Sequence, residues 1–217
     1  VLKQKGHSGK TFKYVNVENN ESYELEIDYP GESLLPINPR DLSIACKIEK
    51  LCKVNHLNRL SDSVLSQKLF GIESDFVERN PKKVRAYKEG VFFDRNTEIK
   101  LFTNDKAGKS GRATWFVVKK NVIENGLDYL NKWKVVVSSA NAGGQKRSSQ
   151  ISILDNYSAF GRSRVALKTF KTKKEAENFK KYCCSNIIKF AFLLTDEALT
   201  SLAKMIPDFQ DSSQNNN

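Results

Sequence analysis

The chain has 217 residues, 39% of them hydrophobic, and its 36 Lys and Arg exceed its 25 Asp and Glu by a net charge of +11. This length allows a substantial core, and no run approaches the ~18 consecutive apolar residues of a membrane span. The N-terminal VLKQKGHSGK lacks the apolar centre of a signal peptide, so we expect a cytoplasmic protein. Because the chain starts at Val and ends in SSQNNN, we expect both ends to be cuts in a longer chain.

The cysteines indicate neither a disulfide framework nor a metal site. Cys183 and Cys184 are adjacent, no CxxC pair exists, and His7 and His56 do not stand at zinc-ligand spacing. Reduced structural thiols, as is usual in the cytosol, are therefore predicted.

The positive charge is concentrated in one third of the chain. Residues 103–174 contain fifteen Lys and Arg but four Asp and Glu, so this window holds the whole net charge of +11. A basic surface confined to one region is typical of proteins that bind a polyanion, nucleic acid before membrane. A general solubilising charge is the alternative explanation.

The chain opens with a predicted β-hairpin. Residues 11–17 (TFKYVNV) and 22–28 (SYELEID) alternate in polarity around ENNE, as paired strands do. Three prolines and a glycine make residues 29–39 a linker.

A helical segment is predicted next. Residues 41–55 form a helix with Asp41 as its cap, and its apolar stripe consists of Leu42, Ala45, Ile48, Leu51 and Cys52. Residues 61–71 predict a short helix with Gly71 just past its end.

Strands dominate the following segment. They are predicted at residues 91–94 (VFFD), 98–103 (EIKLFT), 113–119 (ATWFVVK), 133–138 (WKVVVS) and 164–170 (RVALKTF). Two Gly/Ser-rich loops between them, residues 106–112 (KAGKSGR) and 141–149 (NAGGQKRSS), carry cations, which favours recognition over simple flexibility. Trp115 and Trp133 are expected to be core anchors.

A long helix over residues 172–194 is predicted to follow the sheet. Thr172 and Glu175 form a capping box at its start. Residues 195–209 predict a shorter helix that stops before Pro207. The fold class is therefore α+β: a mixed β-sheet region with basic loops, a helical segment before it and a long closing helix.

Three landmarks in order carry a resemblance to a known family. They are WKVVVSSANAGG (residues 133–144), TFKTKKEAENFKKY (residues 169–182) and an apolar segment over residues 186–209 that ends near Pro207-Asp208. Together they resemble the C-terminal target recognition region of adenine-specific DNA methyltransferases in restriction–modification systems, the TaqI-like and single-chain restriction–methylation enzymes. Residues 98–117 look like the preceding strand pair of that region. The resemblance covers about half of the chain.

The sequence pattern, with the resemblance for the third part, predicts a division into four parts. Residues 1–40 are a hairpin and linker, residues 41–90 a helical segment, residues 91–209 a DNA target recognition domain, and residues 210–217 a disordered tail.

The resemblance also implies a recognition part without its catalytic part. Such enzymes carry a Gly-containing cofactor loop and an Asn-Pro-Pro-Tyr-type motif, whereas here Asn38-Pro39 is followed by Arg and Asn80-Pro81 by Lys. The chain alone is therefore expected to be non-catalytic, with no catalytic residue, metal ligand or cofactor. S-adenosylmethionine and Mg²⁺ are expected for the full-length type II restriction enzyme. The expected partners are double-stranded DNA and the missing methyltransferase domain, with a nuclease domain where one is fused, and no membrane.

Reading DNA requires cations for phosphates and bidentate side chains for base edges. Two arginines, Arg162 and Arg164, lie in the sequence beside Tyr157 and Phe160. With them, the candidate residues near the bases are Ser138, Asn141, Gln145, Lys146, Arg147, Arg162 and Arg164. The candidate phosphate contacts are Lys106, Lys109, Arg112, Lys134 and Lys168.

Two alternatives stay open. A metal-dependent PD-ExK nuclease would use Asp75, Glu98 and Lys100, with Mg²⁺ on the carboxylates, although no Pro precedes Asp75 and ExK matches arise by chance. The second alternative is a general nucleic-acid-binding module, for RNA or DNA, or a protein-docking module. The aromatic octamer of an RNA-recognition motif is not found in the sequence.

Overall fold

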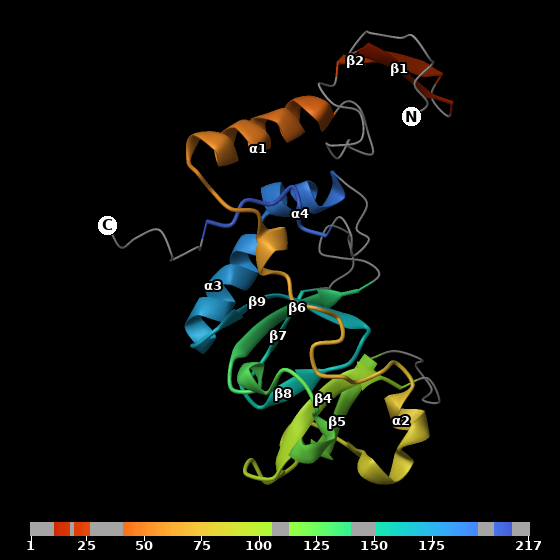
Figure 1. Ribbon diagram of the computed structural model, residues 1–217, viewed down its shortest axis with the longest axis vertical. Coiled ribbons are helices and arrows are strands. Elements are labelled where there is room, and N and C mark those ends of the chain that lie inside the picture. Colours follow the sequence, from red (N-terminus) through yellow and green to blue (C-terminus); the bar gives the residue numbers. More distant parts are fainter. Residues whose placement is uncertain are drawn as a thin grey trace.

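The computed structural model describes residues 11–17, 20–26, 41–105, 113–139, 151–194 and 202–209 (Figure 1). Several predicted segments lie outside these residues: the linker, both basic loops, the first part of the last predicted helix and the tail. The described part has the α+β architecture that the sequence predicts, with three sheets and four α-helices among its residues.

The N-terminal hairpin forms as predicted. Strands β1 (Thr11–Asn16) and β2 (Glu21–Glu26) pair antiparallel, with Asn16 opposite Glu21. Asn20 adopts a φ of 51° in the turn, a left-handed conformation that Asn tolerates better than most residues.

A three-stranded sheet lies in the middle of the molecule. Its antiparallel order is β7 (Ser152–Leu154), β6 (Trp133–Ser138) and β9 (Arg164–Phe170). On β6, Val135 and Val137 pack into one hydrophobic core and Val136 into another. Because successive side chains of a strand point to opposite faces, this sheet is covered on both sides. That position explains an unbroken Val-Val-Val run in place of an alternating pattern.

Helices cover one face of this central sheet (Figure 1). This helical core joins α1 (Leu42–Val54), α3 (Lys173–Cys183), α4 (Asn186–Leu193) and a C-terminal strap, residues 202–209. The strap is fixed by backbone hydrogen bonds: the Leu60 N–H donates to the Ile206 carbonyl, and the Asp208 N–H donates to the Asn58 carbonyl, both at 2.9 Å.

A mixed four-stranded sheet covers the other face. Its order is β3 (Arg85–Ala86), β5 (Ala113–Lys119), β4 (Glu98–Asn104) and β8 (Ser158–Phe160), with β4 and β8 parallel. The segment that includes the short helix α2 (Phe76–Arg79) adds Phe70, Ile72 and Val77 to this sheet core. Single 3₁₀ turns occur at Leu60–Ser63, Pro81–Lys83, Lys120–Val122 and Leu127–Tyr129.

The strand predictions are largely confirmed. Residues 98–103, 113–119, 133–138 and 164–170 are strands, whereas residues 91–94 belong to the loop between β3 and β4. The sequence interpretation missed β3, β7 and β8, which have two or three residues each.

The helix predictions need more correction. The predicted helix over residues 172–194 is two helices, because Ser185 takes an extended conformation (φ −66°, ψ 151°) that ends the first and starts the second. The prediction for residues 61–71 is wrong beyond one 3₁₀ turn, although Gly71 does adopt a φ of +70°. Asp41 stands at the start of α1 but makes no side-chain capping bond. Residues 202–209 form turns, with Ala203 at a φ of 61°, and no α-helix.

The two cores do not follow the predicted boundary between residues 90 and 91. The helical core joins α1 to β6, β9 and α3, and the sheet core joins Phe70 and Val77 to β4, β5 and β8. The predicted domain division therefore separates segments that pack together. All four cysteine thiols are free. Within the described ranges, no helix is both long enough and apolar enough to span a bilayer.

Candidate nucleic-acid interface

The strand ends that carry the two basic loops meet at one edge of the fold. Asn104, where β4 ends, pairs with Ala113, where β5 begins, so the described residues on either side of 106–112 lie next to each other. The turn 161–163 connects this place to the end of β6. The Gly161 N–H donates to the Phe102 carbonyl, and the Ser139 N–H donates to the Ser163 carbonyl, both at 3.0 Å. We call these strand ends and the turn 161–163 the loop-root edge.

Gly161 allows β4 and the turn to approach this closely. A Cβ atom at Gly161 would lie 2.0 Å from the Thr103 Oγ1 and 2.8 Å from the Thr103 Cβ, which no side chain could occupy. The edge therefore depends on a residue without a side chain at this position.

Arg164 is the most distinctive side chain at this edge. It begins β9 and pairs in register with Ser138 at the end of β6. Its guanidinium lies over the Phe102 ring, 5.0 Å from the centroid, and burial lowers its pKa from the ordinary value. No described residue supplies a carboxylate to it. A half-buried cation without an anion is well suited to bind one from outside the chain.

Arg162, two residues before, already has an anionic partner. Its guanidinium forms an ion pair with Glu73 at 2.9 Å, and this hydrogen bond lowers the pKa of Glu73. Its backbone N–H donates to the Ile72 carbonyl at 3.0 Å. Because 43% of its side chain stays exposed, Arg162 faces solvent. Its charge is partly neutralised by Glu73, so it attracts an external anion less strongly than Arg164 does.

Lys134 is a correction to the predicted phosphate contacts. The sequence places it in a basic window, but its side chain is fully buried in the central sheet. Its ammonium donates to the carbonyls of Lys132 at 2.7 Å, Leu130 at 3.3 Å and Asp155 at 3.4 Å. Burial lowers its pKa to about 7, against the opposing effect of the Asp155 charge. A phosphate cannot reach this amine.

Lys168 is a second correction, since its charge is used inside the protein. It lies on β9 opposite Val135, and its ammonium meets the carboxylate of Asp208 at 2.6 Å. Asp208 is 2% exposed and also accepts a hydrogen bond from Ser63 at 3.1 Å. Lys168 therefore holds the strap against the central sheet.

The remaining candidates divide into two groups. Ser138 is half-buried at the end of β6, on the loop-root edge. The others lie outside the described residues: Lys106, Lys109, Arg112, Asn141, Gln145, Lys146 and Arg147. Of the two predicted aromatic neighbours of the arginines, Phe160 is buried against Phe70, and Tyr157 stacks with Arg95 at 4.5 Å.

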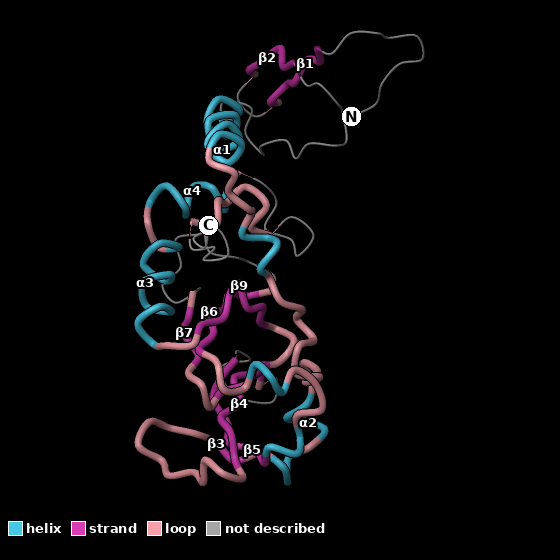
Figure 2. Tube along the Cα trace, turned by 60° about the vertical axis from the view of Figure 1, so that its left-hand side comes forward, coloured by secondary structure: helices cyan, strands magenta, loops and turns pink. Residues whose placement is uncertain are grey.

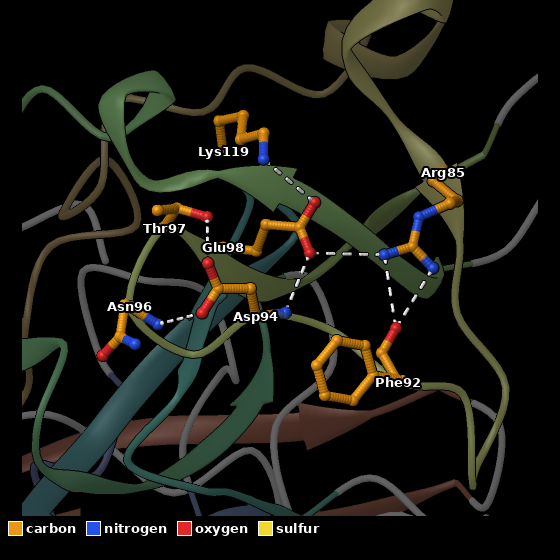
Figure 3. A network of polar contacts seen from close by, with 7 residues as sticks. All are labelled: Arg85, Phe92, Asp94, Asn96, Thr97, Glu98 and Lys119. Carbon is orange, nitrogen blue, oxygen red and sulfur yellow. Dashed lines mark hydrogen bonds and ion pairs between the residues drawn. The ribbon is translucent and has the colours of Figure 1, made fainter.

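The three residues of the alternative nuclease site each have ionic partners outside the set. Asp75 pairs with Arg79, and Lys100 pairs with Asp155. Glu98 accepts the Asp94 N–H at 3.0 Å and lies 3.4 Å from both Arg85 and Lys119 (Figure 3). Across the described ranges, no three His, Cys, Asp or Glu side chains are grouped so that they could hold a metal ion.

The structure also brings together aromatic side chains that the sequence interpretation did not connect. We call Phe102, Trp115, Tyr87 and Phe93 the aromatic row. The centroids of Phe102 and Trp115 lie 4.9 Å apart, those of Trp115 and Tyr87 6.5 Å, and those of Tyr87 and Phe93 6.0 Å. All four rings are half-buried. Alternation within each strand places Phe102 on the face opposite the buried Leu101, but the cross-strand register that sets Phe102 beside Trp115 is visible only in the structure.

Comparison with known proteins gives one partial similarity. The chain is 30% identical over 133 residues to the Anti-sigma-I factor RsgI5 of Acetivibrio thermocellus. The similarity covers 54% of this chain and 26% of that protein, so the chain spans about a quarter of the length of this relative. No family model matches the chain, and no solved structure matches it. A similarity of this extent assigns the chain to no family.

Proposed function

We propose that the chain recognises duplex DNA as the specificity domain of an adenine-specific restriction–modification enzyme. The observation that supports this most is Arg164, a half-buried guanidinium without a carboxylate partner among the described residues, at the edge where both basic loops are rooted. The sequence concentrates the whole net charge of +11 in the window that supplies this edge.

The chemistry of the edge suits a DNA backbone and its base edges. An arginine can bind guanine through two hydrogen bonds or a phosphate through its fork of N–H groups. Lysines on the two loops would bind phosphates and give an affinity that falls as salt rises. Strand ends supply a rigid base for such loops, as in many binding proteins.

In this proposal the chemistry resides elsewhere in the enzyme. The methyltransferase domain would bind S-adenosylmethionine, a fused nuclease domain would bind Mg²⁺, and this chain would select the site. Such an enzyme would act in the cytoplasm, where the chain's thiols would stay reduced.

Substitution of Arg164 tests the proposal. We expect Arg164→Gln to weaken binding to a fluorescein-labelled duplex about tenfold, since one bidentate contact contributes roughly 1–3 kcal/mol. Fluorescence anisotropy at several salt concentrations measures both the affinity and its salt slope. A duplex pool of random sequence, enriched by repeated selection, identifies the preferred site.

Arg79→Gln is the matched control for charge. Arg79 is exposed on α2 and pairs with Asp75, so its loss removes the same charge from a residue outside the strand ends and the turn 161–163. Equal affinities of the two variants would exclude Arg164 as a specific contact, and an unmodified chain that binds no duplex would overturn the proposal.

A second candidate function is binding of a protein. The partial similarity to an anti-sigma-I factor favours it, since the name of that protein denotes action against a sigma-I factor. This candidate predicts that the chain captures a sigma-I factor and binds no duplex, which the same anisotropy measurement distinguishes.

A further inference from the structure

The loop between β3 and β4 presents an aromatic side chain to solvent. This loop, residues 87–97, projects from the end of the four-stranded sheet (Figure 2). Phe92 keeps 84% of its surface exposed and Val91 keeps 37%. An exposed phenylalanine ring gains free energy when a partner covers it, because its burial releases ordered water.

The base of this loop is rigid. The Asp94 carboxylate accepts the Asn96 N–H at 3.0 Å and the Thr97 hydroxyl at 2.8 Å, and these bonds lower its pKa. Both terminal nitrogens of Arg85 donate to the Phe92 carbonyl at 3.4 Å (Figure 3). Glu98 accepts the Asp94 N–H and so joins the loop to β4. The backbone of Phe92 is thus held while its ring stays free.

The loop forms an open, shallow notch, which is lined by Tyr87 and residues 90–95, Phe92 among them. Its lining combines Phe92, Phe93 and Tyr87 with Arg95, whose guanidinium lies 4.5 Å from the Tyr157 centroid. Among the described residues, Arg95 has no carboxylate partner. Aromatic faces beside a free guanidinium match a nucleobase and its phosphate.

The aromatic row connects this notch to the loop-root edge. From Phe93 it passes through Tyr87 and Trp115 to Phe102, over which Arg164 lies. Lys100 stands 5.4 Å from the centroids of both Tyr87 and Trp115. A guanidinium without a carboxylate among the described residues therefore stands at each end of a series of partly exposed rings.

We propose that the aromatic row and the notch at Phe92 bind unpaired nucleotides of DNA. Rings bind bases by stacking, and base faces are accessible only where a strand is unpaired. Arg164 and Arg95 would bind phosphates at the two ends. The inference rests on the proposed function for the choice of DNA, and it adds a strand displaced or extruded beside the recognised duplex.

The test compares a single strand with a duplex. In a Trp133→Phe background, Trp115 is the one tryptophan left of two, and stacking of (dT)20 on the row should quench its fluorescence. We expect Phe92→Ser to reduce the affinity for labelled (dT)20 by about fivefold or more. Duplex affinity should stay within about twofold, since the duplex is assigned to the loop-root edge.

Phe209→Ser is the matched control, since Phe209 is also exposed (53%) but lies on the strap. Equal (dT)20 affinities of the two serine variants, or unquenched Trp115, would overturn the inference. Duplex binding without (dT)20 binding would overturn it too and leave the proposed function standing. Binding of (dT)20 without duplex binding would support the row and refute the proposed duplex recognition.

Discussion

The side-chain amine of Lys134 is fully buried in the central sheet. Three backbone carbonyls surround this amine, and burial lowers its pKa to about 7. In an unfolded chain the same group has a pKa near ~10.4. Between these two values the unfolded chain binds a proton that the folded chain does not, so this residue makes the free energy of unfolding rise with pH.

Lys134→Met should remove that dependence. We expect the unfolding free energy of the unmodified chain to gain roughly 1.6 kcal/mol between pH 7 and pH 8.5 relative to the variant. Urea unfolding at both pH values measures it. Lys181→Met, on the exposed side of α3, is the control and should behave as the unmodified chain. A constant difference between Lys134→Met and the unmodified chain across this range would contradict the expected titration.

At the scale of single elements, α3 shows how a local sequence signal becomes structure. The Glu175 N–H donates to the Thr172 hydroxyl at 3.3 Å, and the Glu175 carboxylate accepts the Thr172 N–H at 2.9 Å and its hydroxyl at 2.8 Å. This capping box satisfies donors that the first turn of the helix leaves unpaired.

Thr172→Ala should cost about 1 kcal/mol of stability, because the helix loses its cap. Thr172→Ser keeps the hydroxyl and should retain most of that stability. Urea unfolding compares the three chains, and hydrogen exchange in the first turn of α3 locates the effect. If alanine and serine proved equally stable, the cap would contribute nothing to this helix.

The sequence was sufficient to predict strands of six or seven residues, because each of these shows its apolar pattern within its own residues. Strands β4, β5, β6 and β9 have six or seven residues each, and their apolar content was sufficient. Strands β7 and β8 have three residues, too few to show a period, and they form because distant partners pair with them. Helical spacing continued through Cys184 and Ser185, so it gave no sign of the break, which leaves Ile187 exposed at 66%.

The candidate site was predictable for the same reason only in part. Glycines and cations in the local sequence identified both loops. The strand pairing that brings the ends of these loops together joins residues far apart in the chain, so the sequence did not show it. Lys134 looked like a surface cation because polarity was the available cue. A strand covered on both faces buries every residue, whichever way its side chain points.

At the scale of the whole molecule, one buried ion pair joins distant parts of the chain. Asp208 on the strap meets Lys168 on β9 and Ser63 near the first 3₁₀ turn. The strap thereby holds the helical layer to the central sheet, and Tyr182 on α3 adds a hydrogen bond to the Pro207 carbonyl at 2.5 Å.

Asp208→Asn should destabilise the chain by about 2–3 kcal/mol, because Lys168 would lose the carboxylate of Asp208 in a largely buried position. Adding Lys168→Met should restore part of this loss, and urea unfolding of the double-mutant cycle measures the coupling. The matched change Asp75→Asn breaks an exposed pair on α2 and should cost less than about 1 kcal/mol. Equal costs at the two positions would mean that the strap is not held by charge.

The strap also determines when the chain can finish folding during its synthesis. Leu60 leaves the ribosome long before its backbone partner Ile206, which lies far later in the chain. Until then the helical layer has α1 but no strap, so its apolar side stays open to solvent and to chaperones. The four-stranded sheet, complete once residue 160 has emerged, can form earlier. The part of the fold that bears the proposed single-strand site would thus mature before the helical part that the strap closes.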